Sequence, residues 1–185
     1  TSWGFICPAE TPEGQSVGVV KNLSYMATVT TFINSQIIHD YIAPRITPVE
    51  TLRPPETYEK AKVIVNGAWI GITDDPDGLY RSLKDKKYKG IINIYTSIVF
   101  DVRKLEVRVC TDSGRVTRPV FKVKNNELLL TEDIVNQLRE GTMGWDDLLT
   151  NHKIEESVIE YIDAEEQLYA LIAMKPVDMQ DSENT

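Results

Sequence analysis

Two carboxylates near the N-terminus, Glu10 and Glu13, stand in a stretch whose backbone is strongly constrained. Pro8 and Pro12 each fix φ and push the residue before them toward an extended conformation, while Gly14 permits a sharp change of direction. Carboxylates held in this way cannot bind phosphate directly, but they can hold basic side chains or backbone N–H groups of a partner. They can equally cap backbone donors nearby, and the sequence leaves both interpretations open.

A second group of carboxylates could suggest a metal site; its members are Glu155, Glu156, Glu160, Asp163, Glu165 and Glu166. These residues are spread over several faces, include no histidine and lack the D-x-D-x-D-G spacing of a calcium loop. We therefore predict no metal site here. The group is interpreted as an acidic surface that faces solvent or a partner.

Charge is segregated along the chain. Residues 84–124 contain 11 Lys and Arg against 4 Asp and Glu, whereas residues 125–185 contain 3 against 15. A basic hairpin could contact nucleic-acid phosphates or another subunit through Arg103, Lys104, Arg108, Arg115 and Arg118. Alternatively, the basic and acidic thirds face each other or are solvated, and the scarcity of aromatic residues in the basic third favours this second hypothesis.

Several classes of site are not supported. Cys7 and Cys110 are far apart and belong to no C-x-x-C pair, and His39 and His152 are the only histidines, so neither a zinc site nor a disulfide framework is indicated. No phosphate-binding glycine motif occurs, which argues against a stand-alone phosphate-binding enzyme. No apolar run is long enough to cross a bilayer. With 185 residues, 42% of them hydrophobic, the chain can form one sizeable core or two small ones.

The elements that position these residues follow from spacing. Apolar residues recur at helical intervals from Val19 to Ala27, which predicts a short amphipathic helix after the proline-rich stretch. Residues 33–55 have no clean period and read as an irregular crossover. Asn66-Gly67 predicts a tight hairpin turn within residues 62–72. A helix should follow, with Asp75 and Pro76 at its start and Leu79, Tyr80 and Leu83 on one face.

The second half reads as strands and short helices. Residues 91–100 form a predicted strand, and residues 105–111 alternate between apolar and polar. A turn at residues 111–114 should return the chain as a partner strand over residues 115–123, where Pro119 indicates an edge or a bulge. Further predictions are helices at residues 131–138 and 145–149, a strand-like segment at residues 171–174 and a frayed linker over residues 178–185.

Five segments of the chain resemble, in the same order, the second-largest subunit of multisubunit DNA-directed RNA polymerases. They read CPAETPEGQ with GVVKNLSYM, VNGAWIGI, TDSGRVTRPVF, EYIDAEE and LIAM, and Ala9-Glu10 and Gln15 resemble the RNA polymerase II type most closely. The resemblance implies an α+β internal fragment with a fork arm and a compact external lobe. Its parts would be the fork (1–31), the external 2 domain (32–176) and a linker or tail (177–185).

In that family the fork lies beside the downstream edge of the RNA–DNA hybrid. The resemblance therefore implies active-centre-proximal positions for Glu10, Glu13, Gln15, Lys21 and Asn22, with Lys21 and Asn22 beginning the fork helix. The whole enzyme transfers nucleotides with Mg²⁺ bound mainly by the largest subunit, so this fragment would carry no catalytic residue and no cofactor of its own.

The resemblance also implies partners and a location. The partners would be the largest and other polymerase subunits, the DNA template and the RNA–DNA hybrid, with no membrane contact. The location would be intracellular: the nucleus for a cellular protein, or the viral factory or virion for one encoded by a large DNA virus. The alternative hypothesis is a stand-alone interaction module that binds transcription factors or other polymerase subunits through its acidic third.

Overall fold

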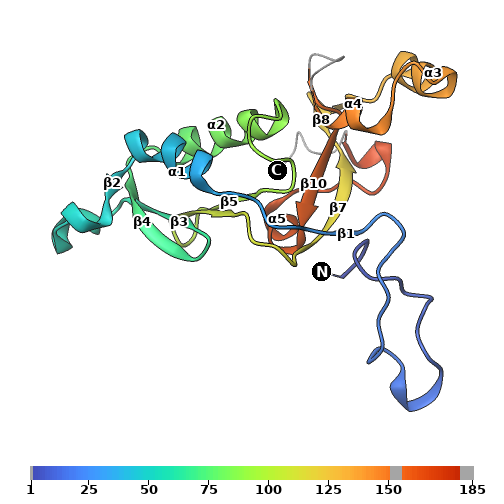
Figure 1. Ribbon diagram of the computed structural model, residues 1–185, viewed down its shortest axis with the longest axis horizontal. Coiled ribbons are helices and arrows are strands. Elements are labelled where there is room, and N and C mark those ends of the chain that lie inside the picture. Colours follow the sequence, from blue (N-terminus) through green and yellow to red (C-terminus); the bar gives the residue numbers. More distant parts are fainter. Residues whose placement is uncertain (1, 151–155, 180–185) are drawn as a thin grey trace.

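The computed structural model describes residues 2–150 and 156–179. An extended arm (residues 2–27) projects from a body made of two lobes (Figure 1). We call residues 31–111 the first lobe, and residues 28–30, 112–150 and 156–179 the second lobe. Each lobe has its own hydrophobic core, and the mixture of helices and small sheets confirms the α+β class.

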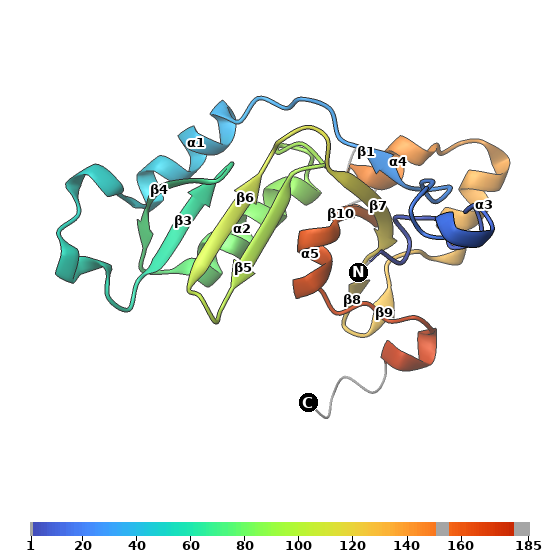
Figure 2. The ribbon, with the colours of Figure 1, turned by 90° about the horizontal axis from the view of Figure 1, so that it is seen from below.

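The first lobe is a five-stranded sheet with two helices on one face (Figures 1 and 2). Its core is formed by apolar side chains of the sheet and both helices, among them the buried Val63, Val107, Ile42 and Leu83. β3 and β6 are parallel and every other pair is antiparallel. The strands, in sheet order, are β2 (Thr47–Pro48), β4 (Ala68–Thr73), β3 (Ala61–Val65), β6 (Glu106–Cys110) and β5 (Ser97–Asp101), and the helices are α1 (Gln36–Ile42) and α2 (Pro76–Tyr88).

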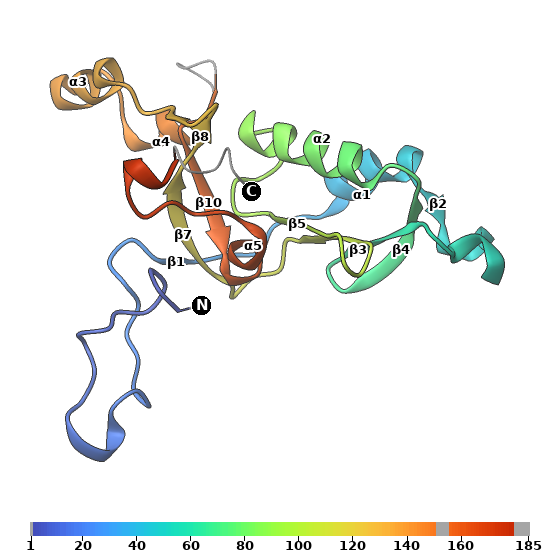
Figure 3. The same cartoon turned by 180° about the vertical axis from the view of Figure 1, so that it is seen from behind.

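The second lobe contains a three-stranded antiparallel sheet and three short helices (Figure 3). Met143, Leu148, Val158 and Tyr161 are at the centre of its core. The sheet order is β1 (Thr28–Val29), β7 (Val116–Phe121) and β10 (Ile159–Asp163), and a small hairpin joins β8 (Val123–Lys124) to β9 (Glu127–Leu128). The helices are α3 (Glu132–Glu140), α4 (Trp145–Leu149) and α5 (Ala164–Tyr169).

Short 3₁₀ turns complete the chain at Gly14–Ser16, Ala43–Arg45, Val49–Thr51, Pro54–Thr57 and Pro176–Met179. Among the helices of the described residues, none is long and apolar enough to span a bilayer. Cys7 and Cys110 are free thiols. His152 lies outside the described residues.

Elements with a strong local signal are confirmed. Asn66 and Gly67 adopt φ of 49° and 79° between β3 and β4, as the hairpin turn requires. Asp75 Oδ1 accepts a hydrogen bond from Gly78 N at 2.9 Å and caps α2. Helices α3 and α4 also begin where the sequence predicts them. Thr131 is the N-cap residue of α3, and Trp145 is the first residue of α4.

The predicted helix from Val19 to Ala27 is wrong. The two legs of the arm pair with each other instead, through Cys7 N donating to Asn22 O at 2.9 Å and Ser24 N donating to Phe5 O at 3.0 Å. An isolated nine-residue helix gains too little from its own hydrogen bonds to compete with this pairing. The apolar spacing that suggests a helix therefore marks side chains that remain exposed on an extended leg.

The crossover over residues 33–55 is more regular than its sequence suggests. It contains α1, whose Ile38 and Ile42 are buried against the sheet, and the edge strand β2. The strand predicted over residues 91–100 is also shorter than expected, because regular pairing covers only Ser97–Asp101. In both segments tertiary burial decides the structure more than local periodicity does.

The predicted hairpin of residues 105–111 with residues 115–123 is wrong. β6 lies in the first lobe between β3 and β5, whereas β7 lies in the second lobe between β1 and β10. Pro119 is therefore in the central strand of a sheet. It is tolerated because β1 pairs only with Val116 and Thr117 and leaves one side of β7 open at Pro119.

The segment of residues 171–174 is not a strand, contrary to the prediction. It follows α5 as an irregular stretch in which Leu171 is fully exposed. Of the predicted frayed linker, residues 178 and 179 belong to a 3₁₀ turn, and residues 180–185 lie outside the described residues. The division of the chain at residues 31 and 176 stays a prediction.

Substitutions at Gly114 test the turn that links the two lobes. Gly114 has φ of 81° and nothing lies within 4 Å of a Cβ built there, so a side chain is opposed by the backbone conformation alone. We expect Gly114→Val to lower the free energy of unfolding by about 1–3 kcal/mol and Gly114→Asn to cost less, because Asn tolerates the left-handed region. Equal urea midpoints for the two variants would contradict this account.

Candidate functional site

Hydrogen bonds join the two legs of the arm. Thr11 Oγ1 donates to Val20 O at 3.2 Å and accepts from Gly18 N at 3.0 Å. Asn22 Nδ2 donates to Glu10 O at 3.0 Å. Gly18 turns the chain with φ of 78°, in open space. These hydrogen bonds make the arm a two-legged loop, and its second leg is not the predicted helix.

The charged side chains of the arm are presented to solvent. Glu10, Glu13, Gln15 and Lys21 are exposed, and Asn22 is partly buried because its side chain holds the opposite leg. Within the described residues neither carboxylate pairs with a cation, and Glu13 does not cap the turn that follows it. The interpretation in which these carboxylates cap local backbone donors therefore fails. They remain available for groups outside the chain.

The root of the arm is fixed to the second lobe. Phe5 is buried, and the Arg118 guanidinium lies 5.6 Å from the centre of its ring. Ser24 Oγ donates to Gly4 O. The arm then enters the sheet as β1, where Thr28 Oγ1 and Thr117 Oγ1 are hydrogen bonded at 2.9 Å. The position of the arm thus depends on β7.

A buried ion cluster joins the lobes and fixes β7 and β10 in turn. Lys84 Nζ lies 2.5 Å from Glu160 Oε1 and 2.7 Å from Glu166 Oε1. Lys87 Nζ lies 3.3 Å from Glu166 Oε2 and donates to Tyr161 O at 2.9 Å. The four charged side chains are at most 12% exposed. We call Lys84, Lys87, Glu160 and Glu166 the inter-lobe ion cluster.

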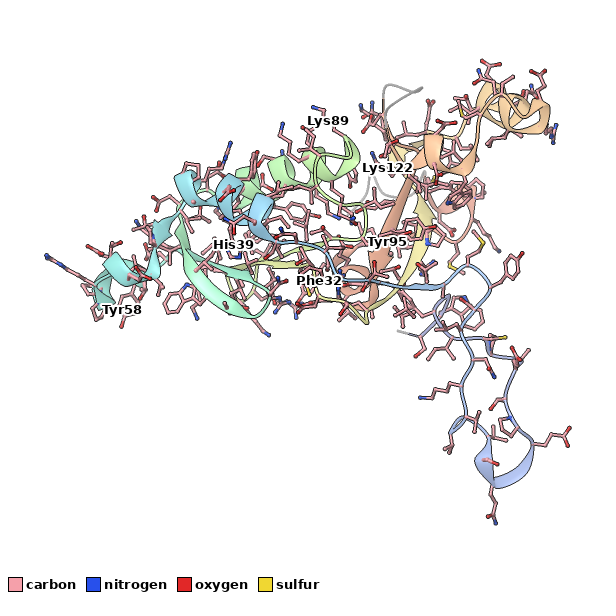
Figure 4. All side chains as sticks on the ribbon, viewed as in Figure 1. Phe32, His39, Tyr58, Lys89, Tyr95 and Lys122 are labelled. Atoms are coloured by element: carbon pink, nitrogen blue, oxygen red, sulfur yellow. The ribbon has the colours of Figure 1, made fainter. Side chains whose placement is uncertain are left out.

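Neutral groups complete the inter-lobe ion cluster. Tyr88 OH donates to Glu160 Oε2 at 2.9 Å, and Ile98 N donates to Glu166 Oε1 at 3.2 Å. Lys122 Nζ lies 3.5 Å from the centre of the Tyr88 ring. Figure 4 shows Lys122 in the second lobe close to the end of α2, where Lys89 is labelled. Buried charge is therefore both paired and hydrogen bonded, as stability requires.

The cluster perturbs the pKa of several groups. Burial alone would raise the pKa of Glu160, but the nearby Lys87 and Lys84 outweigh it and lower the pKa to about 2. Burial would likewise lower the pKa of Lys84, yet Glu166 and Glu160 raise it. Burial, followed by the negative charge of Glu160, raises the pKa of Tyr88. All of these groups therefore keep their ordinary charge at neutral pH.

The five predicted contact residues of the basic third are not gathered on one surface. Arg108 Nε lies 2.9 Å from Glu165 Oε1, Arg115 Nη1 lies 2.8 Å from Asp163 Oδ2, and Arg118 Nε donates to Gln167 Oε1 at 2.8 Å. These three arginines bind β10 and α5. Arg103 and Lys104 lie exposed in the turn between β5 and β6. A role of the five in nucleic-acid or subunit contact stays a prediction.

The acidic group is only partly a solvated surface, which corrects its interpretation. Glu160, Asp163 and Glu166 are buried or nearly so and bind the basic third, whereas Glu165 remains half exposed. Glu155 lies outside the described residues. The hypothesis that the basic and acidic thirds face each other is thus confirmed for Glu160, Asp163, Glu165 and Glu166.

Comparison with known proteins matches three parts of the chain, in order, to RNA polymerase Rpb2: domain 3 at residues 1–29, domain 4 at residues 63–124 and domain 5 at residues 145–185. DNA-directed RNA polymerase II subunit RPB2 of Encephalitozoon cuniculi is 39% identical over 94% of this chain and 15% of that protein. DNA-directed RNA polymerase subunit Rpo2 of Saccharolobus shibatae is 36% identical over 97% of the chain and 16% of that protein. DNA-directed RNA polymerase subunit 2 of Acanthamoeba polyphaga mimivirus is 31% identical over 98% and 15%.

The chain belongs to the RNA polymerase Rpb2 family. The resemblance to the second-largest subunit is confirmed, with the matched domains in the order that the motifs predicted. The chain spans 15% to 16% of the length of these relatives. In this Rpb2-family chain the arm belongs to the part matched by domain 3, and the two sides of the inter-lobe ion cluster belong to the parts matched by domains 4 and 5.

No metal centre emerges from the parts of this Rpb2-family chain that the structure describes: they contain no group of three or more His, Cys, Asp or Glu side chains that could hold an ion. No catalytic step is therefore assigned to them.

Sequence analysis missed Lys84, Lys87 and Tyr88 as positioning residues. The sequence places Lys84 and Lys87 in the basic segment of residues 84–124 without giving either a positioning role. The charge segregation could have revealed them. A strongly basic segment followed by a strongly acidic one can pair its cations with the carboxylates of the other segment in a shared interface. The helical spacing of these three residues places them on one face of α2.

Substitutions of two adjacent glutamates in α5 test how much the inter-lobe ion cluster contributes to the free energy of unfolding. Glu166→Gln removes one buried negative charge from beside Lys84 and Lys87, so we expect the free energy of unfolding to fall by about 3–5 kcal/mol. The control Glu165→Gln removes a half-exposed partner of Arg108 and should cost less than about 1 kcal/mol. Urea unfolding measures both. Equal losses of unfolding free energy in the two variants would show that the buried cluster contributes no more than a half-exposed ion pair.

The free energy of unfolding should also decrease as the pH falls through a defined range. Glu160 has a folded pKa of about 2 and an unfolded pKa of about 4.3, so the folded chain binds fewer protons between these values. The contribution of Glu160 is therefore complete above about pH 5 and is lost as the pH falls toward 2. We expect a shallower acid dependence of the free energy of unfolding in Glu160→Gln than in the wild type. Parallel profiles of unfolding free energy against pH for the two proteins would contradict the lowered pKa of Glu160.

Proposed function

We propose that this chain is part of the second-largest subunit of a DNA-directed RNA polymerase, where the arm contributes to RNA synthesis beside the active centre and the two lobes hold it in place. The observation that carries this proposal is the match of Rpb2 domains 3, 4 and 5 in chain order, together with a relative that aligns over 94% of the chain. The partners would be the largest subunit, other subunits, the DNA template and the RNA–DNA hybrid. The chain would work inside a cell, in the nucleus or at a site of viral transcription.

The geometry of the arm supports an interaction beyond the chain. Val17, Val19 and Val20 are more than half exposed near its tip, next to the unpaired carboxylate of Glu13. A loop that exposes this much apolar surface gains little stability from its own side chains. It is instead held by backbone pairing between its legs and by the buried Phe5 at its root. Such a loop is suited to present carboxylates to basic groups of another polypeptide near the nucleic acid.

The role of Glu13 can be measured in the assembled polymerase. Glu13→Ala removes an exposed carboxylate without opening a cavity, so we expect normal assembly and a change of about 2- to 10-fold in elongation rate or misincorporation, equivalent to at most about 1.4 kcal/mol. The matched control is Glu140→Ala, which removes an exposed carboxylate from the end of α3, on the opposite side of the body from the arm (Figure 1).

A wild-type rate and error frequency for Glu13→Ala would contradict the proposed role of the arm. An equal change in the Glu140→Ala enzyme would show a general effect of surface charge. Failure of both variants to assemble would instead point to a defect in folding, which urea unfolding of the isolated chain would detect.

The isolated chain should fold and remain inactive. Both cores are formed by its own residues, whereas the described residues offer no metal-binding group. We expect a cooperative unfolding transition and no nucleotide incorporation with Mg²⁺ on a primed scaffold. Incorporation by the purified chain above that of a mock preparation would contradict this proposal.

An interaction module that binds transcription factors through its acidic third is the weaker proposal. Glu160, Asp163 and Glu166 are used inside the chain, which removes three of its carboxylates from the available surface. Binding of a factor by the isolated chain that survives neutralisation of Arg108, Arg115 and Arg118, but not of Glu132, Asp133 and Glu140, would favour it.

A further inference from the structure

One side of β7 is open for half of its length. Lys122 N donates to Val158 O beside β10, whereas Arg115 O accepts from Thr30 N beside β1. Backbone groups of successive residues point to opposite sides of a strand, so the even-numbered residues face β10 and the odd-numbered residues face β1. β1 reaches only as far as Thr117. The backbone groups of Pro119 and Phe121 therefore point toward an edge that β1 does not cover.

This edge has a specific pattern of free groups. Pro119 offers only a carbonyl oxygen, because proline has no N–H, while Phe121 offers both an N–H and a carbonyl oxygen. No hydrogen bond joins these groups to another described residue beyond the β7–β10 pairing. A row of unpaired backbone groups is the feature that an added strand recognises.

The edge borders an open hollow of about 1080 Å³ between the lobes. Its apolar lining includes Trp3 and Met26 at the root of the arm, Phe121 of β7, and Leu171 and Met174 after α5. Each of these five side chains is between 44% and 100% exposed. So large an exposed apolar surface beside a free sheet edge indicates a buried contact in the complete protein.

We propose that an extended, apolar segment of the same subunit, from outside these 185 residues, pairs with β7 at Pro119 and Phe121 and fills this hollow. It would continue the line of β1 along β7 and place alternate side chains against Trp3, Met26 and Leu171. This inference rests on the proposed function, because it requires the chain to be part of a complete polymerase subunit.

Two observations select this occupant. The free backbone groups require an extended polypeptide, since nucleic acid cannot pair with a strand edge in this register. The hollow is framed by residues matched by three consecutive domains of one subunit: Trp3 and Met26 by domain 3, Phe121 by domain 4, and Leu171 by domain 5. About five-sixths of each relative lies outside the matched region, so a subunit of that length supplies further polypeptide for this edge.

Photo-cross-linking in the assembled polymerase tests the occupant. Phe121 is replaced by p-benzoylphenylalanine in the full subunit, and variants are carried forward only if they enter a polymerase that synthesises RNA, which tests the proposed function separately. Irradiation should then link position 121 to a peptide of the same subunit outside the 185 residues. The control replaces Tyr58, which is exposed at the far end of the first lobe (Figure 4), and should not link to that peptide.

Hydrogen exchange tests the pairing itself. Phe121 carries the one backbone N–H between residues 118 and 121 that faces the open edge, since Arg118 and Val120 face β10 and Pro119 has none. In the isolated chain this amide should exchange rapidly. In the assembled polymerase it should be protected at least 100-fold, as a difference of about one deuteron in peptides spanning β7.

Each other outcome would overturn the proposal. A cross-link from position 121 to a different subunit or to nucleic acid would show another occupant. No cross-link in an active enzyme, or equal exchange of the Phe121 amide in the isolated chain and the polymerase, would show that the edge stays open.

Discussion

The structure depends on burying four charged side chains between two small lobes. Removing ions such as Lys87 and Glu166 from water is costly, and the cost is recovered only because each is paired and also hydrogen bonded to the backbone. Hydrophobic residues could fill the same space, but they would not fix the angle and register of α2 against β10 and α5 in the same way. Two separate cores therefore behave as a single support.

The support extends to the arm through the sheet of the second lobe. β10 is fixed by Lys87 and Glu160, β7 pairs with β10, and β1 pairs with β7 and continues into the arm. Arg115 and Arg118 add contacts to Asp163 and Phe5 along the same path. A chain of strand pairs thus links a buried ion cluster to an exposed loop whose tip has no core of its own.

Features with a local cause could be predicted from the sequence. Asn66-Gly67 determines a turn through its backbone geometry, and Asp75 and Thr131 determine two helix caps through their side-chain oxygens. Partners distant in sequence could not be predicted: alternation identified β6 and the following turn suggested β7, but neither signal could show that the two strands lie in different sheets. Likewise, the sequence located Glu10 and Glu13, whereas the absence of local partners for them required the structure.

The central claim is that the inter-lobe ion cluster makes the two lobes one cooperative unit. Hydrogen exchange of the isolated chain across a urea titration tests it in a single sample, by comparing β3 and β6 in the first lobe with β10 and α4 in the second. The account predicts that protection is lost from both sets at the same urea midpoint. Two distinct midpoints, with one lobe unfolding while the other stays protected, would contradict it.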